Sequence, residues 1–130
     1  MAGFTNYTED LVLDWLLTAG AATRPTSWYA GLYTVAPTDT GGGTQVSGGS
    51  YARTAGTFAV SGTSPTTAAN SAAIEFPTAT ASWGTVVAVG IFDAVTAGNL
   101  LAYANLNSSA AITTGDALRF NAGALTVTLD

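Results

Sequence analysis

Beyond Pro25 the chain consists of short segments in which apolar and polar residues alternate, separated by turn-forming clusters about every ten residues. In residues 124–130, for example, Leu and Val alternate with Thr, which is typical of a half-buried strand. Gly84–Ala94 is instead an almost continuous apolar run, typical of a central strand covered on both faces. This pattern predicts a mainly β fold: an antiparallel β-sandwich or jelly roll of about eight strands over residues 26–130.

The turn signals give approximate boundaries for these strands. A polar turn around Pro65 separates the second predicted strand from the third. Because 130 residues suffice for one hydrophobic core, we expect a single domain over residues 1–130. The segments with the clearest strand pattern are 27–34, 51–60, 70–76, 84–94, 100–106, 117–120 and 124–130.

A short helix is predicted near the N-terminus, over residues 7–18. Asn6 and Glu9 have the spacing of a capping box, and Gly20 follows as a stop signal. Apolar residues point in nearly every direction, so the helix needs cover on several sides. It either contacts a neighbouring subunit or plugs one end of the sandwich. Its apolar residues are Leu11, Val12, Leu13, Trp15, Leu16 and Leu17.

Residues Ala36–Ser50 are predicted to form a long loop with two Gly clusters, flexible unless a partner orders it. The loop is longer than a hairpin needs, so we expect it to join the helix in contacting sister subunits or other proteins. The candidate interface residues are Leu11, Val12, Trp15, Leu16, Gly41, Gly42, Gly43 and Gln45.

The chain lacks most of the side-chain types that enzymes use for catalysis. The chain has no His, Cys or Lys, and its basic residues are Arg24, Arg53 and Arg119. General acids, bases and nucleophiles mostly come from the missing types, so we expect no enzymatic activity. The formal net charge of −5 also argues against binding to nucleic acid or to an anionic membrane, which both attract basic surfaces. No export signal or membrane anchor is predicted.

The acidic residues are dispersed and lack the alternating oxygen ligands of a calcium loop. We therefore predict no metal site and no other cofactor. A hydrolase could work with two carboxylates alone, but Glu9 and Glu75 are the only glutamates and Glu9 has a capping role. The aspartates near predicted turns, where Asp is a common turn former, are Asp39, Asp93, Asp116 and Asp130.

Charged residues make up only 8% of the chain, about a third of the fraction in an average soluble domain. The centres of protein interfaces are depleted in charge, so this composition favours a protein that hides much of its surface in an assembly. The alternative is a monomer coated with Ser, Thr and Gly.

Two further groups of side chains have alternative interpretations. Trp28, Tyr29 and Tyr33 are candidates for a platform on which a glycan stacks, although core or interface packing is the commoner use of such residues. Tyr51 and Trp83 are further members of this aromatic set.

Arg53 and Arg119 lie inside predicted strands beside apolar residues, where a guanidinium needs a carboxylate or carbonyl partner. We expect each to form an ion pair, with Glu75 and Asp93 as the available acids.

Several segments resemble a family of small structural proteins of tailed bacteriophages. They are WYAGLYT, GGSYAR, FPTATASWGTVVAVGIFDAVTAGNLL and ITTGDALRFNAGALTV, in this order. The resemblance covers about Tyr7–Asp130. Members are described as tail-fibre-like, minor tail or head-decoration proteins. The resemblance implies a non-enzymatic virion component made in the cytoplasm of a host bacterium.

Three functions follow as hypotheses. The first is a capsid decoration or cement protein, a homotrimer that binds the major capsid protein and stabilises the assembled head. The second is a tail or fibre module that contacts tail proteins and adheres to a host surface glycan. The third, a carboxylate-based hydrolase, has the least support. The head surface is the favoured location.

Overall fold

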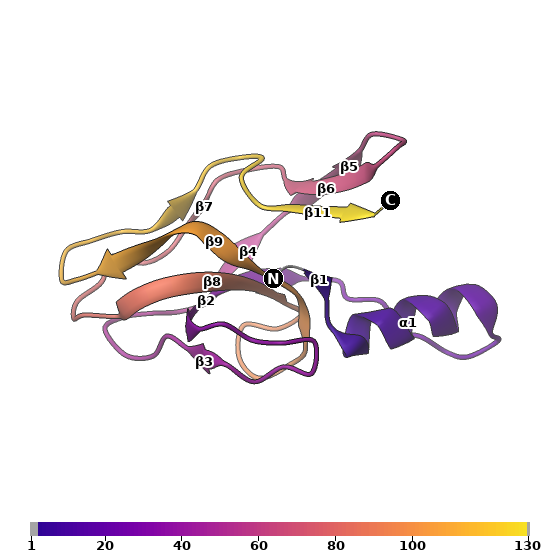
Figure 1. The fold of residues 1–130 in the computed structure, drawn as a ribbon, viewed down its shortest axis with the longest axis horizontal. Coiled ribbons are helices and arrows are strands. Elements are labelled where there is room, and N and C mark those ends of the chain that lie inside the picture. Colours follow the sequence, from indigo (N-terminus) through magenta and orange to yellow (C-terminus); the bar gives the residue numbers. More distant parts are fainter. Residues whose placement is uncertain (1–2, 130) are drawn as a thin grey trace.

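The computed structural model describes residues 3–129, and its largest sheet contains six antiparallel strands (Figure 1). In spatial order the strands are β1 (Gly3–Phe4), β9 (Leu100–Ile112), β8 (Gly84–Phe92), β2 (Trp28–Val35), and then β3 (Thr44–Gln45) and β4 (Thr54–Gly56). The long strands β9, β8 and β2 form the centre of the sheet, and β3 and β4 both pair with β2.

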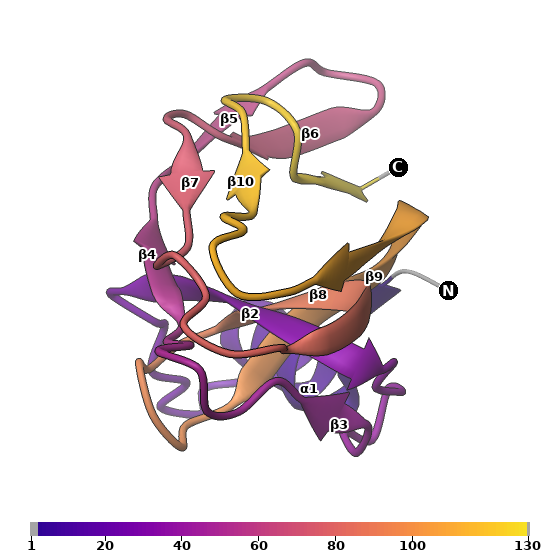
Figure 2. The same cartoon turned by 90° about the vertical axis from the view of Figure 1, so that its left-hand side faces the viewer.

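Two smaller antiparallel sheets form a second layer over one face of the large sheet (Figure 2). A three-stranded sheet has the order β11 (Thr126–Leu129), β6 (Thr66–Asn70) and β5 (Phe58–Ser61). A two-stranded sheet pairs β10 (Arg119–Phe120) with β7 (Ile74–Glu75). The prediction of a mainly β, antiparallel fold is confirmed.

The main hydrophobic core lies between these two layers. Leu32 and Val86 enter it from the large sheet, and Ile74 and Phe76 enter it from the second layer. All four side chains are at most 2% exposed. The alternation of apolar and polar residues along the strands therefore directs the apolar side chains into one contiguous cluster.

The opposite face of the large sheet is also covered, by a smaller cluster around Tyr33 and Phe92. Their rings stack with centroids 6.2 Å apart. They lie over Gly31 and Gly90, which are paired across β2 and β8. A Cβ at Gly31 would lie 2.8 Å from the Phe92 ring, so glycine is required for the rings to approach the backbone. The prediction that 84–94 is a central strand covered on both faces is confirmed by β8.

The single helix of residues 3–129, α1 (Asn6–Leu17), confirms the predicted helix, but the predicted capping box is wrong. Thr5, not Asn6, is the N-cap residue, and its side chain makes no capping hydrogen bond. Its hydroxyl instead donates to the carbonyl of Leu100 at 2.6 Å. The Thr8 hydroxyl donates to the carbonyl of Leu101 at 2.7 Å. These bonds anchor the first turn of the helix to β9.

Other boundaries also differ from the prediction. The expected strand 51–60 is two strands, β4 and β5, interrupted at Thr57. Residues 66–69, expected to belong to the turn around Pro65, instead form most of β6. Residues 3–129 contain eleven strands rather than about eight, and β9 continues beyond the predicted end at residue 106. Asp130 lies outside the described residues.

Candidate assembly surface

Helix α1 extends away from the sheets instead of lying on them (Figure 1). Within the helix only Thr8 is buried. The start of α1 is held by the Thr5 and Thr8 bonds to β9, and the backbone N–H of Asn6 donates to the carbonyl of Asp39 at 2.9 Å. The later turns have no comparable attachment, so the interpretation of this helix as a plug in the end of the sandwich is wrong.

The free part of α1 exposes large apolar side chains on two sides. Successive residues of a helix turn by about 100°, which places Leu13, Leu16 and Leu17 on one side and Trp15 on another. Their exposed fractions are 55%, 62% and 73% for the three leucines and 69% for Trp15. Exposed apolar patches on the order of a few hundred Å² mark interaction sites on soluble proteins. This surface, Leu13, Trp15, Leu16 and Leu17, is called the α1 surface below.

The chain segment that returns from α1 covers part of another side of the helix. Leu11, Val12 and Trp15 face Ala22 and Arg24 across a hollow of about 310 Å³. Of the predicted interface residues on the helix, Leu11 is half-buried and Val12 is 38% exposed. Trp15 and Leu16 therefore remain the most available members of the predicted set.

The Gly-rich segment 36–50 is more ordered than predicted. It contains β3, which pairs with β2, and a bridge between Thr38 and Gly41. Gly43 has a structural role, because a Cβ there would lie 2.5 Å from the carbonyl oxygen of Val35. A Cβ at Gly41 or Gly42 would meet nothing within 4 Å, so the tip of the loop is open. The expectation that only a partner would order this loop is wrong.

Gln45, the last predicted interface residue, faces the protein itself. Its side-chain amide donates to the Tyr51 hydroxyl at 2.7 Å and accepts from the Arg53 guanidinium at 3.0 Å. The Tyr51 hydroxyl also accepts from the backbone N–H of Leu32 at 2.9 Å. Burial is the main reason that the pKa of Tyr51 is raised, so the hydroxyl stays protonated and can donate as well as accept. Gln45 thus stabilises the contact between β2, β3 and the following segment.

The structure brings the loop and the helix together at Asp39, a contact that the sequence analysis does not predict. The Tyr103 hydroxyl on β9 donates to the Asp39 carboxylate at 2.5 Å. This bond is the main reason that the pKa of Tyr103 is raised. Since the carbonyl of Asp39 accepts from the N–H of Asn6, one residue links the loop, the start of α1 and strand β9 of the large sheet. No local pattern could show this link, because Asp39 and Tyr103 are far apart in the sequence.

The aromatic residues proposed as a glycan platform do not share one exposed face. Tyr33 is 4% exposed and packs against Phe92, whereas Trp28 and Tyr29 are half-buried neighbours in β2. Because successive residues of a strand point to opposite faces, Trp28 and Tyr29 cannot stack on the same sugar.

The two other aromatic residues of that set belong to the core. The indole of Trp83 is 4% exposed and packs edge-on against Tyr51, with centroids 5.4 Å apart. Its N–H donates to the carbonyl of Gly49 at 2.9 Å, so its polar atom has a partner inside the protein.

One of the two predicted ion pairs is confirmed. Arg119 on β10 lies 3.3 Å from Glu75 on β7, across the two-stranded sheet. The ion pair expected for Arg53 is wrong, because its guanidinium donates to backbone carbonyls instead. Asp93, the expected partner, accepts from the backbone and side chain of Asn99 at 2.7 and 2.9 Å. Among residues 3–129, no group of three or more acidic residues could hold a metal ion.

Within the part of the chain that the structure describes, no helix has the length and apolar character needed to cross a membrane.

The chain matches the family model described as Podophage GP4 fiber I protein gp80 over residues 3–128. It belongs to this family. The expected relationship to structural proteins of tailed bacteriophages is confirmed, and the chain is a structural protein of the virion. No curated protein matches the sequence significantly.

Proposed function

We propose that this chain is a non-enzymatic subunit of a phage fibre and assembles through the α1 surface. The observation that carries the proposal is the helix: it extends from the body and exposes Leu13, Trp15, Leu16 and Leu17. Leaving such side chains in water is unfavourable by about 25 cal/mol for each Å² of apolar area. Contact with another subunit removes this cost.

The oligomer is proposed to be a homotrimer. In a three-helix bundle the two neighbours of a helix lie on the same side of it, so the helix needs one broad apolar face. Leu13, Leu16 and Leu17 form such a face on α1, and all three are exposed. The low content of charge, 8% of residues, supports the same arrangement because like charges would repel between copies.

The proposal places the protein in a fibre rather than on the head, where the sequence analysis favours it. The support is the family description, which names a fibre protein. Absence of enzymatic activity is part of the proposal and is supported by the lack of His, Cys and Lys. Binding to a glycan is not included, because the aromatic residues that suggest it are divided between the core and two faces of β2.

The position in the virion can be tested by labelling intact particles with a specific antibody and locating the label by electron microscopy. We expect label on fibres or at their attachment points, in few copies per particle. Label spread over the head at high copy number would overturn the fibre assignment in favour of capsid decoration. Particles with the α1 variant Leu16→Asp should lose the label, while particles with Val60→Asp, an exposed change elsewhere, should keep it.

A further inference from the structure

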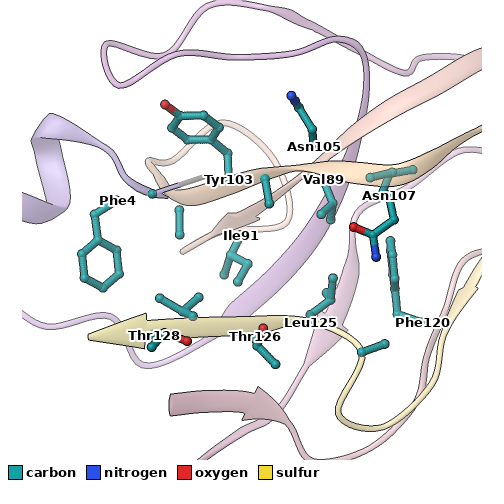
Figure 3. A pocket seen from close by; sticks show the side chains of 16 residues that line it. Phe4, Val89, Ile91, Tyr103, Asn105, Asn107, Phe120, Leu125, Thr126 and Thr128 are labelled. Carbon is teal, nitrogen blue, oxygen red and sulfur yellow. The ribbon is translucent and has the colours of Figure 1, made fainter. Parts of the chain in front are cut away.

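A cleft of about 650 Å³ separates the large sheet from the three-stranded sheet (Figure 3). Val89 and Ile91 point into it from β8, opposite Leu125 and β11. Phe4 and Phe120 lie toward its two ends. Among residues 3–129, no charged residue lines the cleft, and Asn and Thr side chains add polar groups to its apolar walls. The cleft is therefore an uncharged continuation of the main core that the described residues leave unfilled.

Strand β11 forms one wall of this cleft, and it is an edge strand of its sheet. It lies between β6 and the large sheet in two perpendicular views, so its unpaired edge faces the cleft (Figures 1 and 2). The edge contains none of the Lys, Pro or bulge features by which proteins block unwanted strand pairing.

The hydrogen-bond pattern identifies which backbone groups this edge offers. The N–H of Asn70 donates to the carbonyl of Leu125, the residue opposite it, at 3.1 Å. Opposite pairs in an antiparallel ladder alternate between bonded and non-bonded, so Val127 bonds to β6 while Thr126 and Thr128 do not. The N–H and C=O groups of Thr126 and Thr128 therefore point toward the cleft.

The opposite wall of the cleft, formed by β8 and β9, contains an irregularity in its strand pairing. The pairing of β8 with β9 is interrupted, because Val86 is opposite Ala110 whereas Ala88 is opposite Asn105. Strand β9 thus has extra residues at this point, and such bulges change the direction of side chains. Figure 3 shows the result: Asn105 points away from the cleft, whereas Asn107 points into it toward Phe120 and β11.

We propose that this cleft binds an extended, uncharged segment of a neighbouring virion protein, which adds to β11 as a fourth strand. Main-chain hydrogen bonds to Thr126 and Thr128 would hold the segment, and alternate apolar side chains would occupy the space beside Val89, Ile91 and Leu125. Asn107 supplies a further donor and acceptor at one end.

An extended segment fits this cleft better than other occupants. A helix satisfies its own backbone groups, so it would leave those of Thr126 and Thr128 without partners. A charged segment would lose its hydration, and the lining residues within 3–129 include no opposite charge to compensate. The four residues of β11 give the segment a paired length of about 13 Å at 3.3 Å per residue.

The identity of the partner as a virion protein rests on the proposed function, but the chemistry of the cleft does not. The test uses the isotope-labelled full chain and the capped, uncharged peptide Ac-Ser-Val-Thr-Val-Thr-Ser-NH2, followed by amide NMR. We expect the Thr126 and Thr128 amides to shift on titration. Their hydrogen exchange should slow by at least about tenfold, because their N–H groups become paired.

The key variant is Thr128→Pro, which removes an N–H that points into the cleft without removing a bond to β6. It should abolish binding of the peptide. The matched control is Val60→Pro on β5, the other edge of the same sheet. Since Thr57 bonds to Ser71 opposite it, the Val60 N–H also points outward, and this variant should bind as the original chain does.

A second reagent keeps the test independent of how Thr128→Pro folds. A version of the peptide with N-methylated central residues cannot donate to β11, and we expect it not to bind. Equal binding of both peptides, or no shift of Thr126 and Thr128 at millimolar peptide, would overturn the proposal. So would shifts of these amides by maltotetraose in place of the peptide, because they would identify a glycan site. None of these outcomes depends on where the antibody labels the particle.

Discussion

Arg53 shows how single residues stabilise an interior with few charges. Its guanidinium donates to the carbonyls of Ala94 and Ala97 at 2.9 and 2.7 Å and lies 3.4 Å from the ring centroid of Phe92. Burial is the main effect on the pKa of Arg53 and lowers it, while nearby Tyr51 and other groups favour the charged form. The arginine thus uses carbonyl oxygens and an aromatic face where the sequence suggests a carboxylate.

Asp116 has a comparable role at a turn. Its carboxylate accepts from the backbone N–H of Thr113 at 2.9 Å and from its hydroxyl at 3.1 Å. The backbone bond is the main reason that the pKa of Asp116 lies below its ordinary value of 3.8. The turn at residues 113–116 also contacts Ala79, whose backbone N–H donates to the carbonyl of Asp116 at 2.9 Å.

We predict that Asp116→Ala lowers the midpoint of thermal unfolding by a few degrees at pH 7. Because the pKa is depressed in the folded state, the stabilisation is present above the ordinary pKa of 3.8 and is lost as the pH falls through the lower folded value. The difference between the original chain and the variant should therefore shrink below the ordinary pKa of 3.8. Thermal unfolding followed by circular dichroism between pH 2 and 7 measures it. A difference that stays constant over this range would contradict the assignment.

At the scale of elements, the sequence predicts best where a local pattern decides the structure. The helix and β8 are predicted because each has a long apolar pattern of its own. Strand β6 is missed because Thr66–Asn70 contains no large apolar residue and is a strand only through pairing on both sides. The cleft at β11 and the link through Asp39 depend on segments far apart in the chain, so no window of sequence reveals them.

The predicted interface likewise has one part that a local pattern predicts well, on the helix, and one part that it predicts poorly, in the loop. The helical part of the prediction is based on apolar residues in all directions, and the structure leaves Trp15 and Leu16 free. The loop part is based on glycine content, which indicates an unusual backbone but not a free surface. Gly43 and Gln45 consequently have contacts within the chain.

The exposed side chains of α1 lead to a prediction about self-association. We expect Leu16→Asp to prevent self-association, because a carboxylate in an apolar contact loses hydration without compensation. The fold should not change, since Leu16 is 62% exposed. The mass of the oligomer, measured by light scattering after size exclusion, should fall to that of one chain.

The control for this variant is Val60→Asp, which places the same charge at a site that is 71% exposed on β5. It should leave the oligomer mass unchanged. If both variants dissociate the oligomer, added charge in general is responsible, and the assignment of the interface to α1 is wrong.

At the scale of the whole molecule, two surfaces of different chemistry are available for assembly. The α1 surface consists of largely apolar side chains, with the Trp15 indole N–H as its one polar group, so it suits contact with other copies of the same helix. The cleft beside β11 offers backbone groups and suits an extended chain. A protein with both can associate with itself and bind a neighbour at the same time, as the proposed role in a fibre requires.

The dependence of assembly on salt tests which force holds the copies together. Each chain has a formal net charge of −5, and Glu9, Asp10 and Asp14 lie on α1 itself, so association brings like charges together. Salt screens this repulsion, with a Debye length of about 10 Å at 0.1 M, while apolar contacts are not weakened. We therefore predict that raising NaCl from 20 to 500 mM increases the oligomer fraction in sedimentation velocity at a fixed protein concentration. Dissociation at high salt would show that ion pairs, for example between Arg24 and these acids, hold the oligomer, and would contradict assembly through the apolar α1 surface.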